Sequence, residues 1–213
     1  MGNYKKYFDQ IIRNHYPDRF DQLNARINNH FKSIAPDILF AATSKNPIDR
    51  RLEICSYFIA VFKTLDEQGE TYETMQNISR EVAAEYVRPK NKFQTFLKRL
   101  PAKLSNTWLT NIIINVLNKK FRLRDNPEGF VANIITDKQE TFGIGYGFDI
   151  LECGICKLYK KHHYEKFASI LCEFDEMTSA LAGLKLVRTG TIANGAKKCD
   201  FRFKKVETSS QLK

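Results

Sequence analysis

The residues best suited to chemistry are cysteines and carboxylates in the last third of the 213-residue chain. Cys153 and Cys156 form a C-x-x-C pair, and Cys172 and Cys199 follow it singly. Thiols and carboxylates gathered on short, strongly patterned segments are more typical of a chemical site than of a packing core. We therefore expect the function to reside between residues 152 and 203.

The C-x-x-C pair stands where a predicted strand passes into a predicted helix. On a helix, the three-residue spacing puts the sulfurs of Cys153 and Cys156 on one face, near an N-terminus whose unpaired N–H groups stabilise a thiolate. This environment suits a nucleophile or a metal ligand. The alternative is that Cys156 is a small buried residue of the core, as free cysteines often are.

The two single cysteines lie on different predicted elements. Cys172 and Asp175 are three residues apart on a helix, so one surface can present a thiol and a carboxylate. Asp175 has apolar neighbours, where a carboxylate usually has a partner or a function, although an ordinary exposed aspartate is the alternative. Cys199 alternates with Phe201 and Phe203 on the core-facing side of a strand.

Two other polar pairs have competing interpretations. Helical spacing places His163 on the face of Cys156, where a Cys–His pair would activate the thiol. The favoured interpretation is that these adjacent histidines face water and interact only with the helix dipole, as is common at a helix end. Asp200 and Arg202 point away from the core side of their strand and could equally be a surface pair of little energetic weight.

We expect no cofactor, with zinc as the alternative. Structural zinc sites prefer two close pairs of ligands, and this chain has a single C-x-x-C motif with its other cysteines scattered. The odd cysteine number and the clustering in one region also argue against a disulfide framework.

The first part of the chain shows helical periodicity from residue 3 to about 124. Asn46-Pro47 is a start signal for a helix with apolar residues from Leu52 to Leu65. Further helices are predicted over 72–87 and 93–100, and a last one follows Pro101 and reaches Leu117.

The pattern then changes to alternation. One hairpin is predicted around residues 137–140, with strands over 130–135 and 142–151, and helical segments follow over 153–162 and 164–181. A second hairpin is predicted across Asn194-Gly195, a strong turn dipeptide. Helices followed by β-β-α-α-β-β predict an α+β fold with an antiparallel sheet.

This change of pattern predicts the domain organisation. Residues 1–125 are expected to form a helical region that packs on the sheet unit, and residues 126–208 an α+β unit that carries the site. Residues 209–213 form a short polar tail.

The net charge of +10 is confined to one segment. Between Tyr86 and Arg124 there are ten basic residues and no acidic one, and the rest of the chain is balanced at 24 to 24. Basic segments can bind nucleic acid through phosphates, but no recognised reading motif accompanies this one. A solvated face is the favoured interpretation, and a cationic rim that attracts small carboxylates is the alternative.

Composition and apolar patterning indicate the setting of the protein. A hydrophobic fraction of 43% is ordinary for a globular protein with a core. The stretch from Trp108 to Leu117 is too short to cross a bilayer, and residues 1–6 lack an apolar signal segment. We therefore expect a cytoplasmic protein without a membrane span, whose partner is a small molecule rather than a nucleic acid.

Several motifs in order resemble the C-terminal half of the L-2-amino-thiazoline-4-carboxylic acid hydrolase family, over about residues 128 to 206. They are Glu152-Cys153-Gly154-Ile155-Cys156-Lys157, Leu171-Cys172 with Asp175, Arg188-Thr189-Gly190-Thr191-Ile192-Ala193 with Gly195, and Cys199-Asp200-Phe201-Arg202-Phe203. The resemblance implies hydrolysis of a cyclic amidine, in which water converts L-2-amino-Δ2-thiazoline-4-carboxylate to N-carbamoyl-L-cysteine. The ending is more distantly similar to 4-vinyl reductase-type domains, which would imply a small-molecule binder without catalysis.

Such a reaction needs a nucleophile, an acid and a cation for the substrate carboxylate. Cys153 or Cys156 as thiolate, or water activated by Asp175, would attack the amidine carbon. Asp175 could instead pair with the protonated amidine. Arg188 is the expected carboxylate ligand because its guanidinium matches a carboxylate bidentately. Further candidates for substrate binding are Thr189, Thr191, Cys172 and Cys199. A binding domain without turnover and a zinc-stabilised module remain the rival classes.

Overall fold

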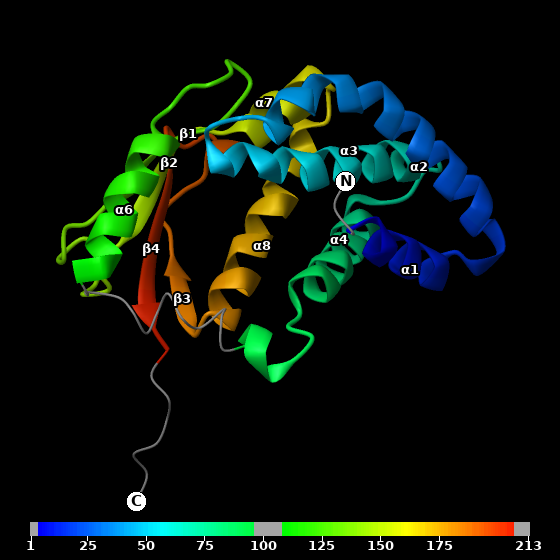
Figure 1. Cartoon of the computed structure of the whole chain (residues 1–213). Coiled ribbons are helices and arrows are strands. Elements are labelled where there is room, and N and C mark those ends of the chain that lie inside the picture. The colour runs from blue at the N-terminus through cyan, green and yellow to red at the C-terminus, as the bar shows by residue number, and fades with distance from the viewer. Residues whose placement is uncertain (1–3, 96–107, 207–213) are drawn as a thin grey trace, which may run out of the picture.

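The computed structural model describes residues 4–95 and 108–206, and helices make up most of the first part of the chain (Figure 1). The helices are α1 (Lys5–His15), α2 (Phe20–Ile34), α3 (Arg51–Asp66), α4 (Tyr72–Val87), α6 (Trp108–Phe121), α7 (Gly154–Lys161) and α8 (Ala168–Leu181). Short 3-10 segments connect several of them, namely η1 (Pro17–Arg19), η2 (Ala35–Ala42), η3 (Pro47–Arg50), η4 (Glu165–Phe167) and η5 (Ile192–Asn194). The strands are β1 (Val131–Ile135), β2 (Gly147–Glu152), β3 (Leu184–Val187) and β4 (Cys199–Lys205).

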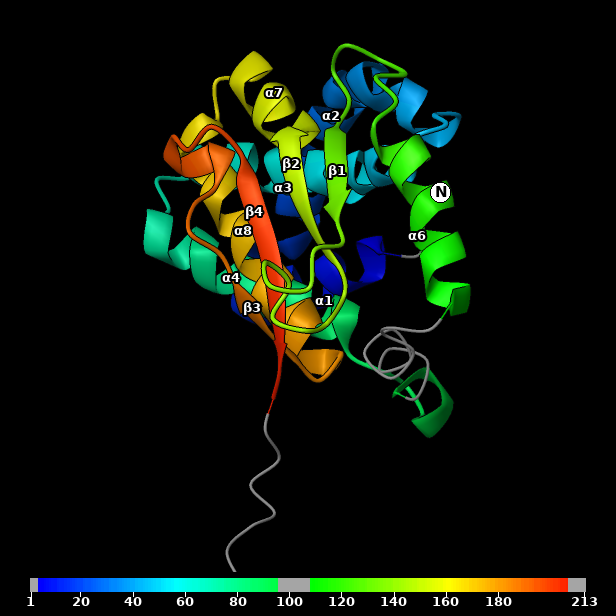
Figure 2. The ribbon, with the colours of Figure 1, turned by 90° about the vertical axis from the view of Figure 1, so that its left-hand side faces the viewer.

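Within the described residues, the strands form a four-stranded antiparallel sheet in the order β1-β2-β4-β3. Figure 2 shows the strands side by side, with α3 and α8 behind them and α6 beside β1. Helices α7 and α8 separate the two strand pairs in sequence, and α8 contacts β3. The predicted α+β fold with its β-β-α-α-β-β unit is confirmed.

Helix α3 is the central element of the helical part. Eleven of its 16 residues are buried, because it lies among α2, α4 and α7 rather than on the surface. The predicted start at Asn46-Pro47 is confirmed in η3, where the Asn46 side chain accepts a hydrogen bond from the Ile48 N–H at 3.2 Å. The predicted helix over 72–87 is α4, which Thr71 caps by accepting from the Thr74 N–H at 3.1 Å.

Buried polar side chains at η3 join the helical part to the sheet. The fully buried Asn46 donates from Nδ2 to the carbonyl oxygen of Phe130 at 2.8 Å. Asp49, only 1% exposed, accepts a hydrogen bond from the N–H of Phe130 at 2.8 Å. Gly129 makes room for this contact, since a Cβ there would lie 2.8 Å from Asp49 Oδ1. The residue before β1 is thereby fixed to the start of α3.

Buried hydrophobic side chains of both parts belong to one cluster, which extends over the described residues from Tyr4 to Phe203. Aromatic rings of α3 pack against α8 and the segment before it: Phe58 lies 5.2 Å from Phe174, and Phe62 stacks on Phe167 at 5.0 Å. The division at residues 125 and 126 stays a prediction.

The second hairpin differs from the expected one. Val187 pairs with Arg202, so residues 188–198 form a long connection instead of a two-residue turn at Asn194-Gly195. Gly195 has φ +87° and ends η5. The dipeptide does turn the chain, but it terminates a 3-10 segment inside the loop.

Other boundaries also shift. Strand β2 begins at Gly147, after turns that include Phe142, so the strand expected from residue 142 is shorter. The helix expected over 93–100 falls largely outside the described residues, as does the tail 209–213. No described helix combines the length and apolar character needed to cross a membrane.

We expect Asp49→Ala to lower the free energy of unfolding by about 2 kcal/mol, because the buried N–H of Phe130 loses its acceptor. Urea unfolding followed by circular dichroism measures the change. The control is Asp125→Ala, which removes an exposed carboxylate that accepts from the Lys45 N–H at 3.0 Å. Equal stability of Asp49→Ala and wild type would contradict a structural role for this contact.

Candidate functional site

The structure gathers the four cysteines of the last third around one small cavity, which we call the thiol cavity. Its volume is about 30 Å³, enough for a water molecule or two. Strands β2 and β4, the start of α7, and helices α3 and α8 supply its walls. The lining residues are Arg51, Phe130, Ile150, Cys153, Ile155, Cys156, Ala168, Leu171, Cys172, Asp175, Cys199 and Phe201.

Cys153 is the thiol most easily ionised. It is the N-cap residue of α7, and it is partly exposed. A hydrogen bond from the Cys156 thiol lowers the pKa of Cys153 to about 7, assisted by the backbone N–H groups of Cys156 and Ile155 and by the charge of Arg51. These groups outweigh the opposing effect of burial. Cys153 therefore ionises at a lower pH than the other cysteines of the cavity.

The other cysteines stay protonated. Donation to Cys153 raises the pKa of Cys156 well above the usual range. Burial raises the pKa of Cys172 and of Cys55 to about 12, and it also raises the pKa of Cys199. The Sγ atom of Cys199 accepts a hydrogen bond from the Ile192 N–H at 3.2 Å. The similar thiols therefore differ in reactivity because of their positions.

Asp175 carries the carboxylate of the site and pairs with two arginines. Arg51 Nη2 lies 3.0 Å from Oδ1, and Arg188 Nη1 lies 3.4 Å from Oδ2. Arg188 also donates to the carbonyl oxygen of Cys172 at 3.3 Å and lies over the ring of Phe201. The Asp175 and Arg188 side chains are each 13% exposed, whereas that of Arg51 is 43% exposed. Arg51 is thus the more accessible cation.

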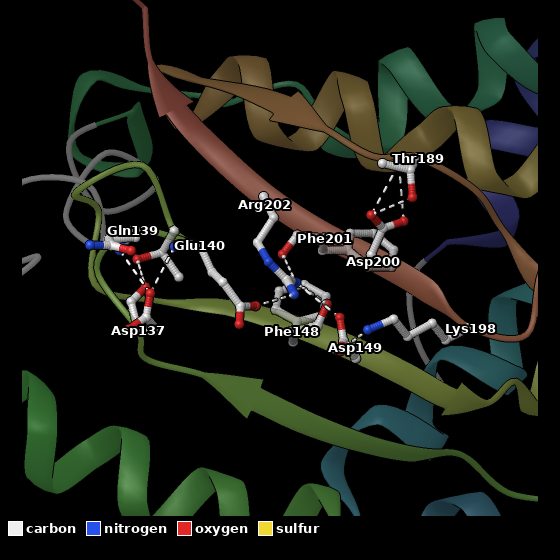
Figure 3. Close-up of polar contacts among 11 residues, drawn as sticks. Asp137, Gln139, Glu140, Phe148, Asp149, Thr189, Lys198, Asp200, Phe201 and Arg202 are labelled. Carbon is white, nitrogen blue, oxygen red and sulfur yellow. Dashed lines mark hydrogen bonds and ion pairs between the residues drawn. The ribbon is translucent and has the colours of Figure 1, made fainter.

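The two threonines expected to bind substrate are not among the residues that line the thiol cavity. Thr189 donates from its N–H and Oγ1 to Asp200, at 3.0 and 2.8 Å (Figure 3). Thr191 is buried and accepts from the Asn194 N–H at 3.3 Å. Both hold the loop that follows Arg188, and their part in substrate binding stays a prediction.

The outer face of the sheet carries a buried charge network. Arg202, 8% exposed, lies 2.9 Å from Asp149 and 3.1 Å from Glu140, and Lys198 is 2.6 Å from Asp149 (Figure 3). The possible surface pair between Asp200 and Arg202 is therefore not what holds either residue. Strand alternation does put both on the outer face, but Arg202 pairs with Asp149 of β2, and Asp200 accepts hydrogen bonds from the loop after β3.

The Cys–His pair, the less favoured of the two interpretations, is not supported by the backbone. Helix α7 ends at Lys161, two residues before His163, and His163 has φ +60°, so helical spacing does not apply to it. His163 is exposed, and His162 is hydrogen-bonded to Asp37 at 2.9 Å.

Two residues of the helical part were not among the sequence candidates. Arg51 begins α3 and lines the thiol cavity, and Cys55 follows it one turn later. Their helical spacing was visible in the sequence, but it gave no sign that α3 would meet the cysteine-rich segment. Among the described residues, no group of three or more His, Cys, Asp and Glu side chains is arranged to hold a metal ion.

We expect the alkylation of Cys153 by iodoacetamide to be governed by a pKa of about 7. Because the thiolate is the reactive form, the rate should fall tenfold for each pH unit below this value and level off above it. Mass spectrometry of the modified peptide measures the rate. Cys156→Ala removes the main hydrogen bond and should move the midpoint upward. Cys172→Ala is the control, and a wild-type midpoint near about 8.5 would contradict the prediction.

Comparison with known proteins identifies a family for the chain. The sequence model of a family described as L-2-amino-thiazoline-4-carboxylic acid hydrolase matches residues 50–203, more than half of the chain. The match begins at Arg50 and so includes α3 and α4, which lie outside the resemblance over about 128 to 206. No match was found among curated proteins or among solved structures. The extent of the family match shows that the chain belongs to the L-2-amino-thiazoline-4-carboxylic acid hydrolase family.

Proposed function

We propose that the protein hydrolyses a cyclic amidine that bears a carboxylate, of the L-2-amino-thiazoline-4-carboxylate type. The observation that carries the proposal is the meeting of a thiol with a lowered pKa, a carboxylate and a partly exposed arginine at one cavity. Cys153, Asp175 and Arg51 supply these groups. A nucleophile, an anion that pairs with the amidinium, and a cation that pairs with the carboxylate match this zwitterionic substrate.

Charge assigns the roles of the polar groups. Arg51, Arg188 and Asp175 together carry two positive charges and one negative charge. The excess positive charge attracts the substrate carboxylate, and Arg51 receives it because Arg188 is packed on Phe201. Asp175 already pairs with two guanidinium groups, so pairing with a further cation, the amidinium, suits it better than proton abstraction.

Cys153 then serves as the nucleophile. Its sulfur adds to the amidine carbon, the bond from that carbon to the ring sulfur breaks, and the ring sulfur leaves as a thiol after taking a proton. Water adds to the same carbon, the bond to Cys153 breaks, and the carbamoyl product departs with the thiolate restored. One water is consumed, and a C–S bond of the ring is replaced by a carbonyl group.

The test is turnover of L-2-amino-Δ2-thiazoline-4-carboxylate, followed by the one new thiol that each opened ring releases. Cys153→Ala is expected to lower kcat at least about a thousandfold, as for other nucleophile deletions. Asp175→Asn is expected to raise KM and lower kcat because the amidinium loses its counter-charge. Glu173→Gln is the matched control, since this carboxylate of α8 pairs with Arg80 at 2.8 Å outside the thiol cavity.

The outcomes separate the alternatives. If Cys153→Ala keeps the wild-type rate and Asp175→Asn loses it, direct attack by water replaces the covalent route. If wild type binds the compound without releasing thiol, the proposal of hydrolysis is overturned and a binding domain remains.

A further inference from the structure

A second and much larger cavity lies among the helices next to the thiol cavity. We call it the helical cavity; its volume is about 470 Å³, which is in the range of small-molecule binding sites. Helices α3, α4 and α8 and the residue before α1 supply its walls. Buried apolar side chains form its floor, namely Cys55, Phe58, Ala83 and Leu171, with Phe174 partly buried beside them.

The two cavities share a wall. Arg51, Leu171 and Asp175 line both of them. The Arg51–Asp175 ion pair at 3.0 Å therefore stands between the apolar space and the thiols. The thiol cavity is too small for a heterocycle, so a substrate whose reacting carbon meets Cys153 needs room on the other side of this pair.

The charged side chains of the helical cavity come from the start of α3 and from α8. Arg50 and Arg51 bring positive charge, and Glu53 and Asp175 bring negative charge, all near the start of α3 or on α8. The hydroxyl of Tyr4 is buried in the wall and has no hydrogen-bond partner among the described residues. Such a group is normally paired, so an unpaired one in a cavity wall is consistent with a site built for a polar ligand.

We propose that the helical cavity binds the apolar portion of a small carboxylic acid, with the acid group paired to Arg51. The apolar portion of the acid contacts Phe58, Ala83 and Phe174 in place of water. Its carboxylate lies at the mouth of the thiol cavity. The substrate class then becomes amidine carboxylates that carry an apolar substituent, a consequence that rests on the proposed function. Binding of the acid itself does not depend on turnover.

The probe is 3-phenylpropionate, compared with the neutral 3-phenylpropionamide of nearly the same shape. Isothermal titration calorimetry on the full chain is expected to show the acid binding at least about tenfold more tightly than the amide. Arg51→Gln should remove this difference, because it removes the guanidinium and leaves the apolar floor intact.

A second experiment fills the helical cavity with an added side chain. Ala83→Phe on α4 should weaken binding of the acid at least about tenfold, because the new ring occupies the apolar space. Ala84→Phe is the matched control: it adds the same ring one position later, where Ala84 is not among the residues lining the helical cavity. Thr178→Phe at the exposed edge of the cavity gives the same test if Ala83→Phe does not fold cooperatively.

Three results would overturn the inference. They are no binding of 3-phenylpropionate, equal affinity of the wild-type protein for acid and amide, or unchanged affinity for the acid in both Ala83→Phe and Thr178→Phe. Failure of hydrolysis is a separate result. If the protein binds the acid in this way but does not open the thiazoline ring, the inference about the helical cavity holds and the proposed function is overturned.

Discussion

The ion pairs of Asp175 hold together segments that are far apart in the chain. Its partner Arg51 lies 124 positions away on α3, and Arg188 follows β3. Without the carboxylate, the guanidinium groups of Arg51 and Arg188 would lose the negative charge that both of them contact, beside an apolar cavity. The wall between the two cavities, and the approach to the thiols, therefore depend on this one charge. Any ligand that binds Arg51 must compete with Asp175 or bind alongside it.

The thiols show how position selects one reactive group from several chemically identical ones. Cys153 lies where a strand ends and a helix begins, so backbone N–H groups and a neighbouring thiol stabilise its anion. The other cysteines have apolar surroundings or donate their proton, and burial or that donation raises the pKa of each. The pKa of Cys153 is thus lowered without a histidine in the lining of the thiol cavity and without a metal ligand set among the described residues.

The sheet supplies a stiff support for these groups. On its outer face Arg202 lies against Gly147, where a Cβ would be 3.0 Å from Arg202 Cδ, and pairs with the buried Asp149. Asp200 accepts hydrogen bonds from the loop that begins at Thr189, directly after Arg188. The charges on one face of β4 therefore help to fix the loop that delivers a cation to the other face, where Cys199 lines the thiol cavity.

Local features were readable from the sequence because their causes lie within a few residues. Helical periodicity predicts α4 at its observed bounds, alternation places Cys199 and Phe201 on the cavity side of β4, and the C-x-x-C spacing predicts an ionisable thiol at a helix start. Turn chemistry is less specific, so Asn194-Gly195 did not reveal its loop length. Only the tertiary structure brings Arg51 to Asp175 and forms the helical cavity, because side chains from distant elements meet through packing that no local pattern encodes.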